Sequence, residues 1–266
     1  MKGSEDQKAA LVTGGGQRIG RALAEALAAD GWFVFVHYNR SADAARQTVA
    51  RIRSAGGRAK PVRADLASAK DAALLIGRCV SPGVALTCVV NNASLFELDR
   101  IATLTADSFD RHMAINLRAP LLLAQAFSRG LPADQVGVVV NLLDQKLWNL
   151  NPDFLSYTLS KIGLQGLTTM LAQALAPRVR VAGIAPGLTL RSGSQTEARF
   201  QAQHAANPLG VGVTPAHLVA ALRFILATPT YTGDTVVIDS GEHLTGRPRD
   251  IAFDKGAAGR ARGRRP

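Results

Sequence analysis

The sequence predicts an α/β fold, a single domain built on a doubly wound parallel sheet with helices on both faces. Short apolar segments rich in Val and Ile alternate along the chain with longer segments in which apolar residues recur at helical spacing. Parallel pairing needs a crossover between strands, and right-handed crossovers pack helices against the sheet. The expected strands are 9–12, 33–36, 87–90, 136–141, 179–184 and 235–238, and the expected helices are 19–29, 42–55, 67–80, 108–128, 156–174 and 215–227.

The composition is that of a packed globular protein. Hydrophobic residues make up 47% of the 266 residues, which excludes a polar disordered chain. The two cysteines, Cys79 and Cys88, lie in apolar segments and indicate neither a disulfide framework nor a thiolate metal site. Residues 1–8 are polar and contain no long apolar run. We therefore expect a cytoplasmic protein that binds neither metal nor membrane.

The net charge of +11 is unevenly distributed along the chain. Residues 247–266 contain seven Lys or Arg against two Asp, so much of the excess lies at the C-terminal end. We expect one domain over residues 1–245, with a polar, mobile substrate loop at 189–213, and a basic, disordered tail at 246–266. A solvated tail is the preferred interpretation, and nucleic-acid binding by it is not expected.

The first expected strand leads directly into a glycine-rich loop that opens a helix. In this context backbone N–H groups can approach a pyrophosphate. A cation in the first turn of a helix faces the positive end of the helix dipole, so Arg18 indicates a nearby anion unless it is simply solvated. The residues expected to bind a dinucleotide here are Gly14, Gln17, Arg18, Ile19 and Gly20.

The second expected strand ends without an acidic residue. An NAD site usually has an Asp or Glu here for the ribose hydroxyls. Arg40 and Ser41 instead offer a cation and a hydroxyl for a 2′-phosphate, although Ser41 can also cap the next helix. This pattern favours NADPH, or its oxidised form NADP+, as the cofactor. The segment expected to contact it is His37, Tyr38, Asn39, Arg40 and Ser41.

Tyr157 and Lys161 form the expected proton-transfer pair. They are four positions apart, so on a helix they lie one turn apart on the same face. A free tyrosine titrates near ~10, and a neighbouring ammonium group can lower that pKa. Such a pair occurs by chance on many helices, but it gains weight when it follows a dinucleotide loop in the same chain.

Taken together, the glycine loop, Asn91-Asn92-Ala93, Asn116, Tyr157-x-x-x-Lys161 and Pro186-Gly187 resemble the short-chain dehydrogenase/reductase family over residues 8–245. The resemblance implies a seven-stranded Rossmann sheet and a homotetramer. It also implies that Asn116 relays protons through water and that Lys161 holds the nicotinamide ribose. The further cofactor contacts that it implies are Asp65, Leu66, Asn91, Asn92, Ala93, Ser94, Pro186, Gly187 and Thr189.

One position departs from the family pattern. The family ordinarily has a serine some thirteen positions before the tyrosine, and this chain has Asp144 there. A carboxyl group beside Tyr157 can pass protons, and it opposes phenolate formation by like-charge repulsion. The site thus favours an acid catalyst. A structural pairing of Asp144 with Lys146 is the simpler alternative.

Within the family, this chain resembles the pteridine reductases. The similarity rests on Arg in the glycine loop, His-Tyr-x-Arg-Ser after the second strand, Asn-Ala-Ser-x-Phe after the fourth, and Asp in place of Ser. It implies a flat pterin-like substrate, stacked on Phe96 opposite the nicotinamide. The substrate contacts that it implies are Arg18, Ser94, Phe96, Asp144, Tyr157 and Leu188. Arg247 also resembles an arginine that in some members reaches a neighbouring subunit's active site, but with one residue inserted.

The expected function is NADPH-dependent reduction of a dihydropterin, dihydromonapterin or dihydrofolate. One alternative is an NADPH-dependent carbonyl reductase, such as a 3-oxoacyl-thioester reductase, against which Asp144 and Phe96 argue. A second is a non-catalytic protein that senses dinucleotides or associates with RNA through its basic tail. The set of Tyr157, Lys161 and Asn116 argues against that alternative.

Overall fold

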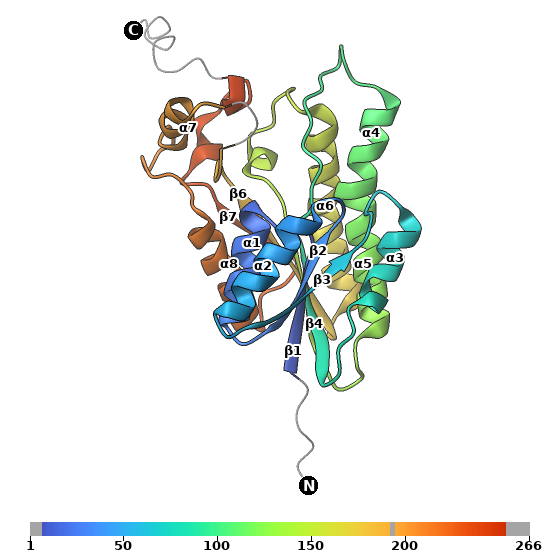
Figure 1. Cartoon of the computed structure of the whole chain (residues 1–266). Coiled ribbons are helices and arrows are strands. Elements are labelled where there is room, and N and C mark those ends of the chain that lie inside the picture. Colours follow the sequence, from blue (N-terminus) through green and yellow to red (C-terminus); the bar gives the residue numbers. More distant parts are fainter. Residues whose placement is uncertain (1–6, 192–194, 254–266) are drawn as a thin grey trace, which may run out of the picture.

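A seven-stranded parallel sheet forms the centre of the protein (Figure 1). The computed structural model describes residues 7–191 and 195–253. The strands lie in the order β3-β2-β1-β4-β5-β6-β7, so the chain starts in the middle, builds outward to one edge and then crosses to build the other. Their bounds are β1 Gln7–Val12, β2 Phe33–Tyr38, β3 Arg58–Arg63, β4 Val84–Asn91, β5 Gly137–Leu142, β6 Val179–Pro186 and β7 Thr235–Ile238.

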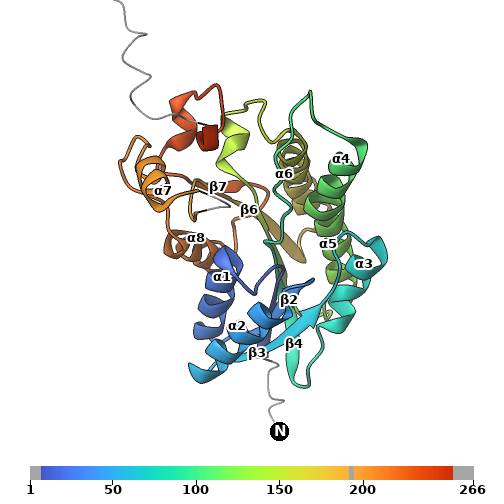
Figure 2. The ribbon, with the colours of Figure 1, turned by 45° about the horizontal axis from the view of Figure 1, so that its top comes forward.

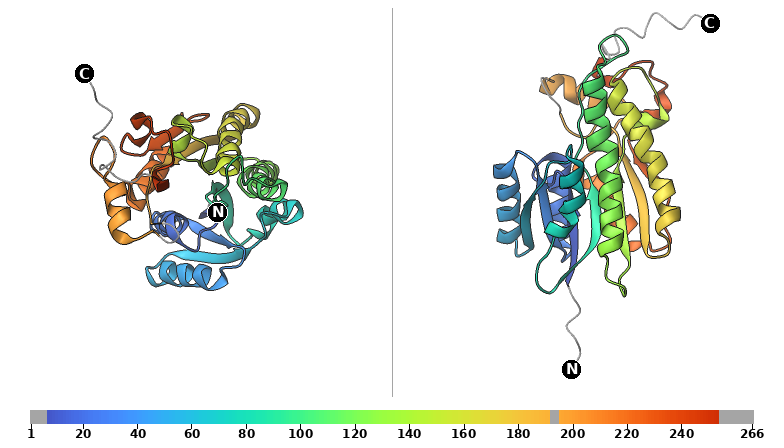
Figure 3. Two further views of the ribbon diagram at one scale, coloured as in Figure 1. Left: turned by 90° about the horizontal axis from the view of Figure 1, so that it is seen from above. Right: turned by 90° about the vertical axis from the view of Figure 1, so that its right-hand side faces the viewer.

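Helices cover both faces of the sheet (Figures 1 and 3). On one face α1, α2 and α8 pack with the buried strand residues into one core cluster, and on the other α3, α5 and α6 do the same. The described helices are α1 Arg18–Ala29, α2 Ala42–Ser54, α3 Ala69–Arg78, α4 Ala106–Met113, α5 Ala119–Gly130, α6 Leu155–Leu175, α7 Glu197–His204 and α8 Pro215–Ala227. The predicted doubly wound fold is confirmed, because the Val-rich strands are buried on both faces as a parallel sheet requires.

Two elements were not expected from periodicity. Strand β3 alternates exposed charged residues with buried ones and contains Pro61, so it lacks the continuous apolar run of the other strands. It lies at the sheet's edge, where a proline is tolerated. Helix α7 lies inside the segment expected to be an irregular substrate loop, and its first turn is capped by the Thr196 side chain.

The segment expected as one helix over 108–128 is divided in the structure. Helix α4 continues through a π-helical turn, η1 Ala114–Arg118, into α5. A π-helical turn is wider than an α-helical one and often occurs at functional sites. Here it carries the buried Asn116.

The polypeptide past β7 remains part of the domain. Two short 3-10 turns, η3 Glu242–Thr245 and η4 Ile251–Phe253, follow β7, and the residues between them contact the rest of the chain. The predicted boundary of a disordered tail at residue 246 is therefore placed too early, because Arg249 binds the buried Asp153 carboxylate. Residues 254–266 of that predicted tail lie outside the described residues.

The carboxyl ends of the strands, α7 and the 3-10 turns that follow β7 lie at the same end of the molecule (Figure 2). This is the end at which parallel α/β sheets bind ligands. Over the described ranges 7–191 and 195–253, no helix is long and apolar enough to cross a membrane.

We predict that Gly20→Ala strongly destabilises the fold. A Cβ atom there would lie 2.3 Å from the Gly14 carbonyl oxygen and 2.5 Å from Asn92 Nδ2, so the glycine loop would have to move. A loss of about 3 kcal/mol in the free energy of unfolding is expected, measured by chemical denaturation.

The matched control is Gly77→Ala in α3, where a Cβ atom would meet nothing within 4 Å. This variant should be neutral or gain up to ~1 kcal/mol, because alanine favours the helix. Equal stability of the two variants would contradict the packing that we describe for the loop.

Candidate active site

The centre of the site is a hydrogen bond between a tyrosine and a carboxylate. Asp144 follows β5 and caps the 3-10 turn η2 Gln145–Trp148, so that its Oδ1 accepts the Lys146 backbone N–H at 2.9 Å. Its Oδ2 accepts the Tyr157 hydroxyl at 2.7 Å. Tyr157 lies in the first turn of α6. The structure therefore brings two of the predicted site residues, Asp144 and Tyr157, into direct contact.

The surroundings of this pair favour its protonated forms. Burial raises the pKa of the Asp144 carboxyl. Burial, together with the adjacent Asp144 charge, raises the pKa of Tyr157 well above its ordinary value. The expectation that the carboxyl would oppose phenolate formation is confirmed. The expectation that Lys161, together with the positive nicotinamide of a bound cofactor, lowers the pKa of Tyr157 stays a prediction.

Lys161 lies one turn along α6, with its ammonium nitrogen 5.7 Å from the centre of the Tyr157 ring. It donates a hydrogen bond to the Leu142 carbonyl oxygen at 2.6 Å, which fixes it against the end of β5. Burial lowers its pKa to about 8. Lys161 is therefore mostly charged at neutral pH, and its charge favours the ionised form of Asp144.

Asn116 joins the catalytic helix to the loop after β4. Its amide group donates to the Leu95 carbonyl and to Ser160 Oγ, both at 2.9 Å, and its carbonyl oxygen accepts from the Leu95 N–H and Ser94 Oγ. The side chain is buried and fully hydrogen-bonded to protein groups. In this arrangement it fixes the position of the loop that carries Ser94, and its predicted role in proton relay stays a prediction.

Phe96 lies directly beside Tyr157. Its ring meets Tyr157 edge-on at 4.7 Å between centroids and stacks on Phe154 at 4.3 Å. It is nevertheless 47% exposed, which leaves part of the ring free for a ligand. Exposed Ser94 lies two residues earlier in the same loop.

A buried histidine, His37, supports the glycine loop by a hydrogen bond to its backbone. Gly14 adopts a left-handed conformation, with φ of 61°, and its N–H donates to His37 Nδ1 at 3.0 Å. The other ring nitrogen of His37 lies 3.2 Å from the Ala64 carbonyl oxygen. These partners suit a neutral ring, and burial lowers the His37 pKa to about 4. His37, predicted to contact the cofactor, is buried beneath the loop and instead supports the backbone that would do so.

Arg18 also has a different partner from the expected phosphate. Its guanidinium donates to the carbonyl oxygens of Arg191 at 2.7 Å and Leu190 at 3.3 Å, and so connects the start of α1 to the substrate loop. The side chain remains exposed. Gln17, the N-cap residue of α1, makes no side-chain capping bond, and the first turn contains no acidic residue. This helix end suits an anion.

The region after β2 keeps the features expected of a phosphate site. Ser41 is the N-cap of α2, but its side chain makes no capping hydrogen bond, and Arg40 beside it is exposed. Asn39 donates to Asp65 Oδ1 at 3.1 Å, which connects the ends of β2 and β3. Tyr38 is partly buried and packs against the core, and Leu66 is buried.

The remaining residues expected to contact the cofactor are Asn92 and Ala93, after β4, and the segment at the end of β6. The backbone N–H groups of Asn92 and Ala93 both donate to Thr13 Oγ1, and Asn92 Nδ2 donates to the Thr13 carbonyl at 2.8 Å. Pro186 ends β6, and Gly187 leads into Leu188 and Thr189. The Thr189 hydroxyl donates to the Gly187 carbonyl. Ile19 packs partly buried against the core. These residues shape the sheet's carboxyl edge where a dinucleotide was expected.

Sequence reasoning missed Glu242, which follows β7 and is buried. Its Oε2 accepts the Leu188 N–H at 3.2 Å, and burial raises its pKa to about 7. The signal that could have found it is a pair of acidic residues, Asp239 and Glu242, close behind the carboxyl end of an apolar strand. It adds a second buried carboxyl group near the residues expected to contact substrate.

Lys146 does not pair with the Asp144 side chain. Its ammonium group is buried and lies 3.0 Å from Asp250 Oδ2, so the simpler alternative of an Asp144–Lys146 ion pair is wrong. Trp148, on the same 3-10 turn, is 38% exposed. The Asp144 carboxyl therefore accepts hydrogen bonds from the Tyr157 hydroxyl and from the Lys146 backbone N–H, and forms no ion pair with the Lys146 ammonium.

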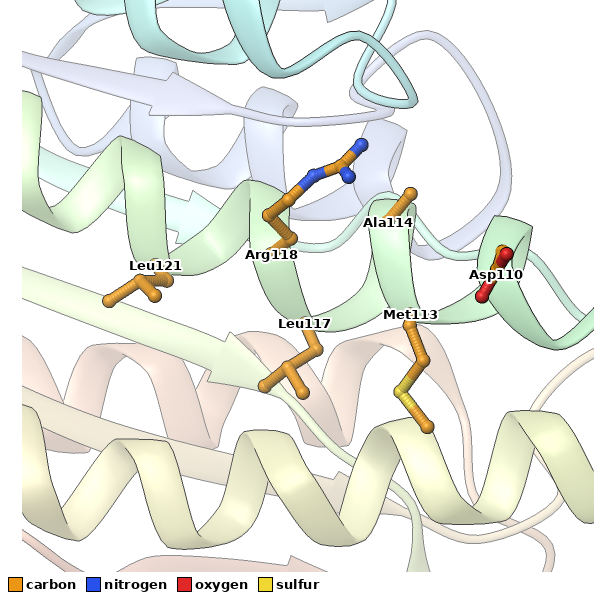
Figure 4. Close-up of a pocket in the computed structure, with 6 residues that line it drawn as sticks. All are labelled: Asp110, Met113, Ala114, Leu117, Arg118 and Leu121. Carbon is orange, nitrogen blue, oxygen red and sulfur yellow. The ribbon is translucent and has the colours of Figure 1, made fainter.

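A surface hollow lies outside this site (Figure 4). Its lining comes from the continuous helix of α4, η1 and α5, and consists of Asp110, Met113, Ala114, Leu117, Arg118 and Leu121. None of these residues was predicted to bind ligand. Within residues 7–191 and 195–253, no group of three or more His, Cys, Asp or Glu could hold a metal ion.

Comparisons with known proteins show the family to which the chain belongs. The family profile described as short chain dehydrogenase matches residues 8–202. An uncharacterized oxidoreductase of Methylorubrum extorquens is 32% identical, over 88% of this chain and 97% of its own length. A 3-oxoacyl-[acyl-carrier-protein] reductase of Synechocystis is 30% identical, over 87% and 95% of the two chains.

Among solved structures, FolM alternative dihydrofolate reductase 1 from Brucella canis, complexed with NADP, is 41% identical and superposes with a TM-score of 0.87. The match covers 93% of this chain and 98% of that one. Family profile, relatives and fold all agree with the resemblance predicted from the motifs. The chain therefore belongs to the short-chain dehydrogenase family of oxidoreductases.

Proposed function

We propose that this protein is an NADPH-dependent reductase of a pterin-type substrate, a dihydropterin, dihydromonapterin or dihydrofolate. The observation that carries the proposal is the 2.7 Å contact between the Tyr157 hydroxyl and the Asp144 carboxyl. It places beside the tyrosine a group that can supply a proton when it is protonated, where a ketone reductase of this family has a serine. The 41% identity to the FolM alternative dihydrofolate reductase from Brucella canis supports the same substrate class.

The donor groups at the sheet's carboxyl edge fit NADPH. Gly20 packs so tightly on the loop that a Cβ atom would reach the Gly14 carbonyl, and this packing keeps the loop's N–H groups close to the helix end. The exposed Arg40 and the uncapped Ser41 hydroxyl would hold the 2′-phosphate. When bound, NADPH supplies a hydride for the substrate's C=N carbon.

Tyr157 and Asp144 would supply the proton in one relay. Because burial raises the pKa of Asp144, this carboxyl retains its proton to higher pH than an ordinary aspartic acid. Tyr157 donates its hydroxyl proton to the substrate nitrogen and receives one from Asp144 in return. No phenolate has to form, which matters because the pKa of Tyr157 is raised well above its ordinary value. The carboxylate left on Asp144 is stabilised by the charge of Lys161.

Phe96 would position the substrate. Its half-exposed ring lies against Tyr157, so a flat ring stacked on Phe96 would bring a ring nitrogen within reach of the phenol. An aliphatic thioester gains nothing comparable from such a surface. The second buried carboxyl, Glu242 beside Leu188, also suits a substrate rich in N–H donors.

The homotetramer implied by the family resemblance remains part of the proposal, as does a cytoplasmic location. The partly apolar hollow on α4 and α5 would suit contact with another subunit (Figure 4). Leu121, one of its lining residues, is an exposed apolar side chain.

The proposal predicts the outcome of a substrate screen. NADPH oxidation should be measured with oxidised pterins, dihydropterins, dihydrofolate and a 3-oxoacyl thioester. We expect turnover with a dihydropterin or dihydrofolate at a kcat/KM at least about ten-fold above that of the thioester. Activity confined to the thioester would replace the proposal with carbonyl reduction, the activity that the name of the Synechocystis relative gives.

Substitutions at the central hydrogen bond separate the roles of its two partners. Tyr157→Phe should lower kcat at least about 100-fold, because it removes the proton donor. NADPH binding, measured by fluorescence titration, should change less than about two-fold. Asp144→Ser should lower pterin reduction and raise reduction of simple ketones. Substantial residual turnover in Tyr157→Phe, or no change of preference in Asp144→Ser, would contradict the relay.

Arg40 is predicted to select NADPH over NADH. Arg40→Ala should lower kcat/KM for NADPH by about 10- to 100-fold and leave that for NADH nearly unchanged, since only NADPH has the 2′-phosphate. The control is Arg46→Ala in α2, the helix that follows Arg40, where the Arg46 guanidinium pairs with Asp43 on the exposed surface. Equal losses for both cofactors in Arg40→Ala would exclude a phosphate contact.

A further inference from the structure

Residues 246–253, which we call the C-terminal strap, cross the catalytic end of the molecule. They follow η3 and lie beside α7 and the segment after β5 (Figure 2). The strap includes two basic side chains, Arg247 and Arg249, one carboxylate, Asp250, and the ring of Phe253. No part of the catalytic relay described above uses these side chains.

The strap is fixed to the catalytic segment by a fully buried carboxylate. Asp153, between Asp144 and Tyr157 in sequence, has 0% exposure. Arg249 binds it in a bidentate manner, with Nε 2.6 Å from Oδ2 and Nη2 2.7 Å from Oδ1. The Asp250 backbone N–H donates to the same carboxylate at 3.0 Å. The Arg249 guanidinium is the main reason that the pKa of Asp153 lies far below its usual range. Bidentate pairs of this kind are strong and directional.

A second ion pair reaches the turn that holds Asp144. Lys146 donates from its buried ammonium group to Asp250 Oδ2 at 3.0 Å and to the Asp153 carbonyl at 2.6 Å. The backbone N–H of the same lysine donates to Asp144. The position of the Asp144 carboxyl is thus coupled to the strap through a single residue.

The strap also binds the substrate loop and the loop after β4. Arg199 and Gln203, both on α7, donate to the carbonyl oxygens of Ala252 and Ile251. Arg247 donates to the Ala206 carbonyl, just past α7. From the loop after β4, Arg100 donates to Asp153 Oδ1 at 3.0 Å, and its guanidinium lies 4.7 Å from the centre of the Phe253 ring. Three segments that are distant in sequence therefore meet on the strap.

A row of aromatic rings leads from the strap to the catalytic tyrosine. Phe253 lies 6.0 Å from Phe154, Phe154 stacks on Phe96 at 4.3 Å, and Phe96 meets Tyr157 at 4.7 Å. Phe154 adopts a left-handed backbone conformation, with φ of 55°, which is unfavourable for a bulky residue and needs surrounding contacts to hold it. The rings of Phe253 and Phe96 and the Lys146 ammonium supply such contacts.

We propose that the C-terminal strap is a substrate-positioning element, in which Arg249 and Phe253 hold Phe154, and through it Phe96, in the orientation that receives a flat aromatic substrate. This inference rests on the proposed reduction of a pterin-type substrate. The strap contacts α7, the loop after β4 and the segment after β5. These are the segments expected to lie around the substrate. No hydrogen bond or ion pair joins it to the described residues of the glycine loop or of β2. It therefore acts on substrate affinity, with little effect on cofactor affinity.

The test is Arg249→Ala in the full-length protein, with Phe253→Ala as a second variant. Each should raise KM for the dihydropterin or dihydrofolate about ten-fold, since a misplaced Phe96 stacks poorly. Each should leave KM for NADPH, and kcat at saturating substrate, within about two-fold of the wild type. The separation of the two KM values is what a merely structural role would not produce.

The matched control is Arg223→Ala, which removes another bidentate ion pair, with Asp30, on α8 and α1 away from the site. It should change neither KM. If both strap variants resemble this control, or raise both KM values in proportion, the strap proposal is wrong. A wild-type enzyme that reduces no dihydropterin or dihydrofolate would instead overturn the proposed function, and the strap proposal with it.

Discussion

Parallel pairing in the middle of the sheet is the constraint on which the site depends. Strands β4, β5 and β6 pair in register, with Asn91 opposite Asn141 and Asn141 opposite Gly183. Buried amides fix this register, because Asn91 donates to Asn141 at 2.8 Å and Asn141 donates to Thr168 of α6 at 2.9 Å. The two strands must therefore end level with each other and with the catalytic helix. The loops that follow β4 and β5 therefore start side by side at the carboxyl edge of the sheet.

Given that edge, short local segments are enough to assemble the chemistry. Asp144 lies two residues past the end of β5, and Phe96 lies a few residues past β4. Tyr157 in the first turn of α6 then faces both of them. Burial then sets the pKa of Asp144. The carboxyl group is removed from water, and this raises its pKa. A serine in this place would donate a hydrogen bond but could not supply a proton in the same way.

The buried ion pairs of Asp153 and Lys146 fix the positions of the loops around Tyr157. The ion pairs around Asp153 and Lys146 lie close to aromatic rings, with the Lys146 ammonium 5.3 Å from the centre of the Phe154 ring. Removing one partner of such a pair leaves the other buried without compensation, so these contacts define one arrangement of the loops. The two buried carboxyl groups thereby keep separate partners, with Asp144 bonded to Tyr157 and Asp153 to Arg249 and Arg100.

The sequence by itself determined the alternation of strands and helices, the glycine loop, the absence of an acid after β2 and the unusual Asp144, because each of these is written in residues close together in the chain. It also indicated the family, since several motifs occur in one order. Only the tertiary structure decided that His37 supports the loop from beneath, that Arg18 donates to the substrate loop and that Lys146 pairs with Asp250. It alone brought residues 246–253 onto the site. Contacts between residues about 100 positions apart, such as Arg249 with Asp153, leave no periodic pattern, and their energy comes from burial that exists only after the chain has folded.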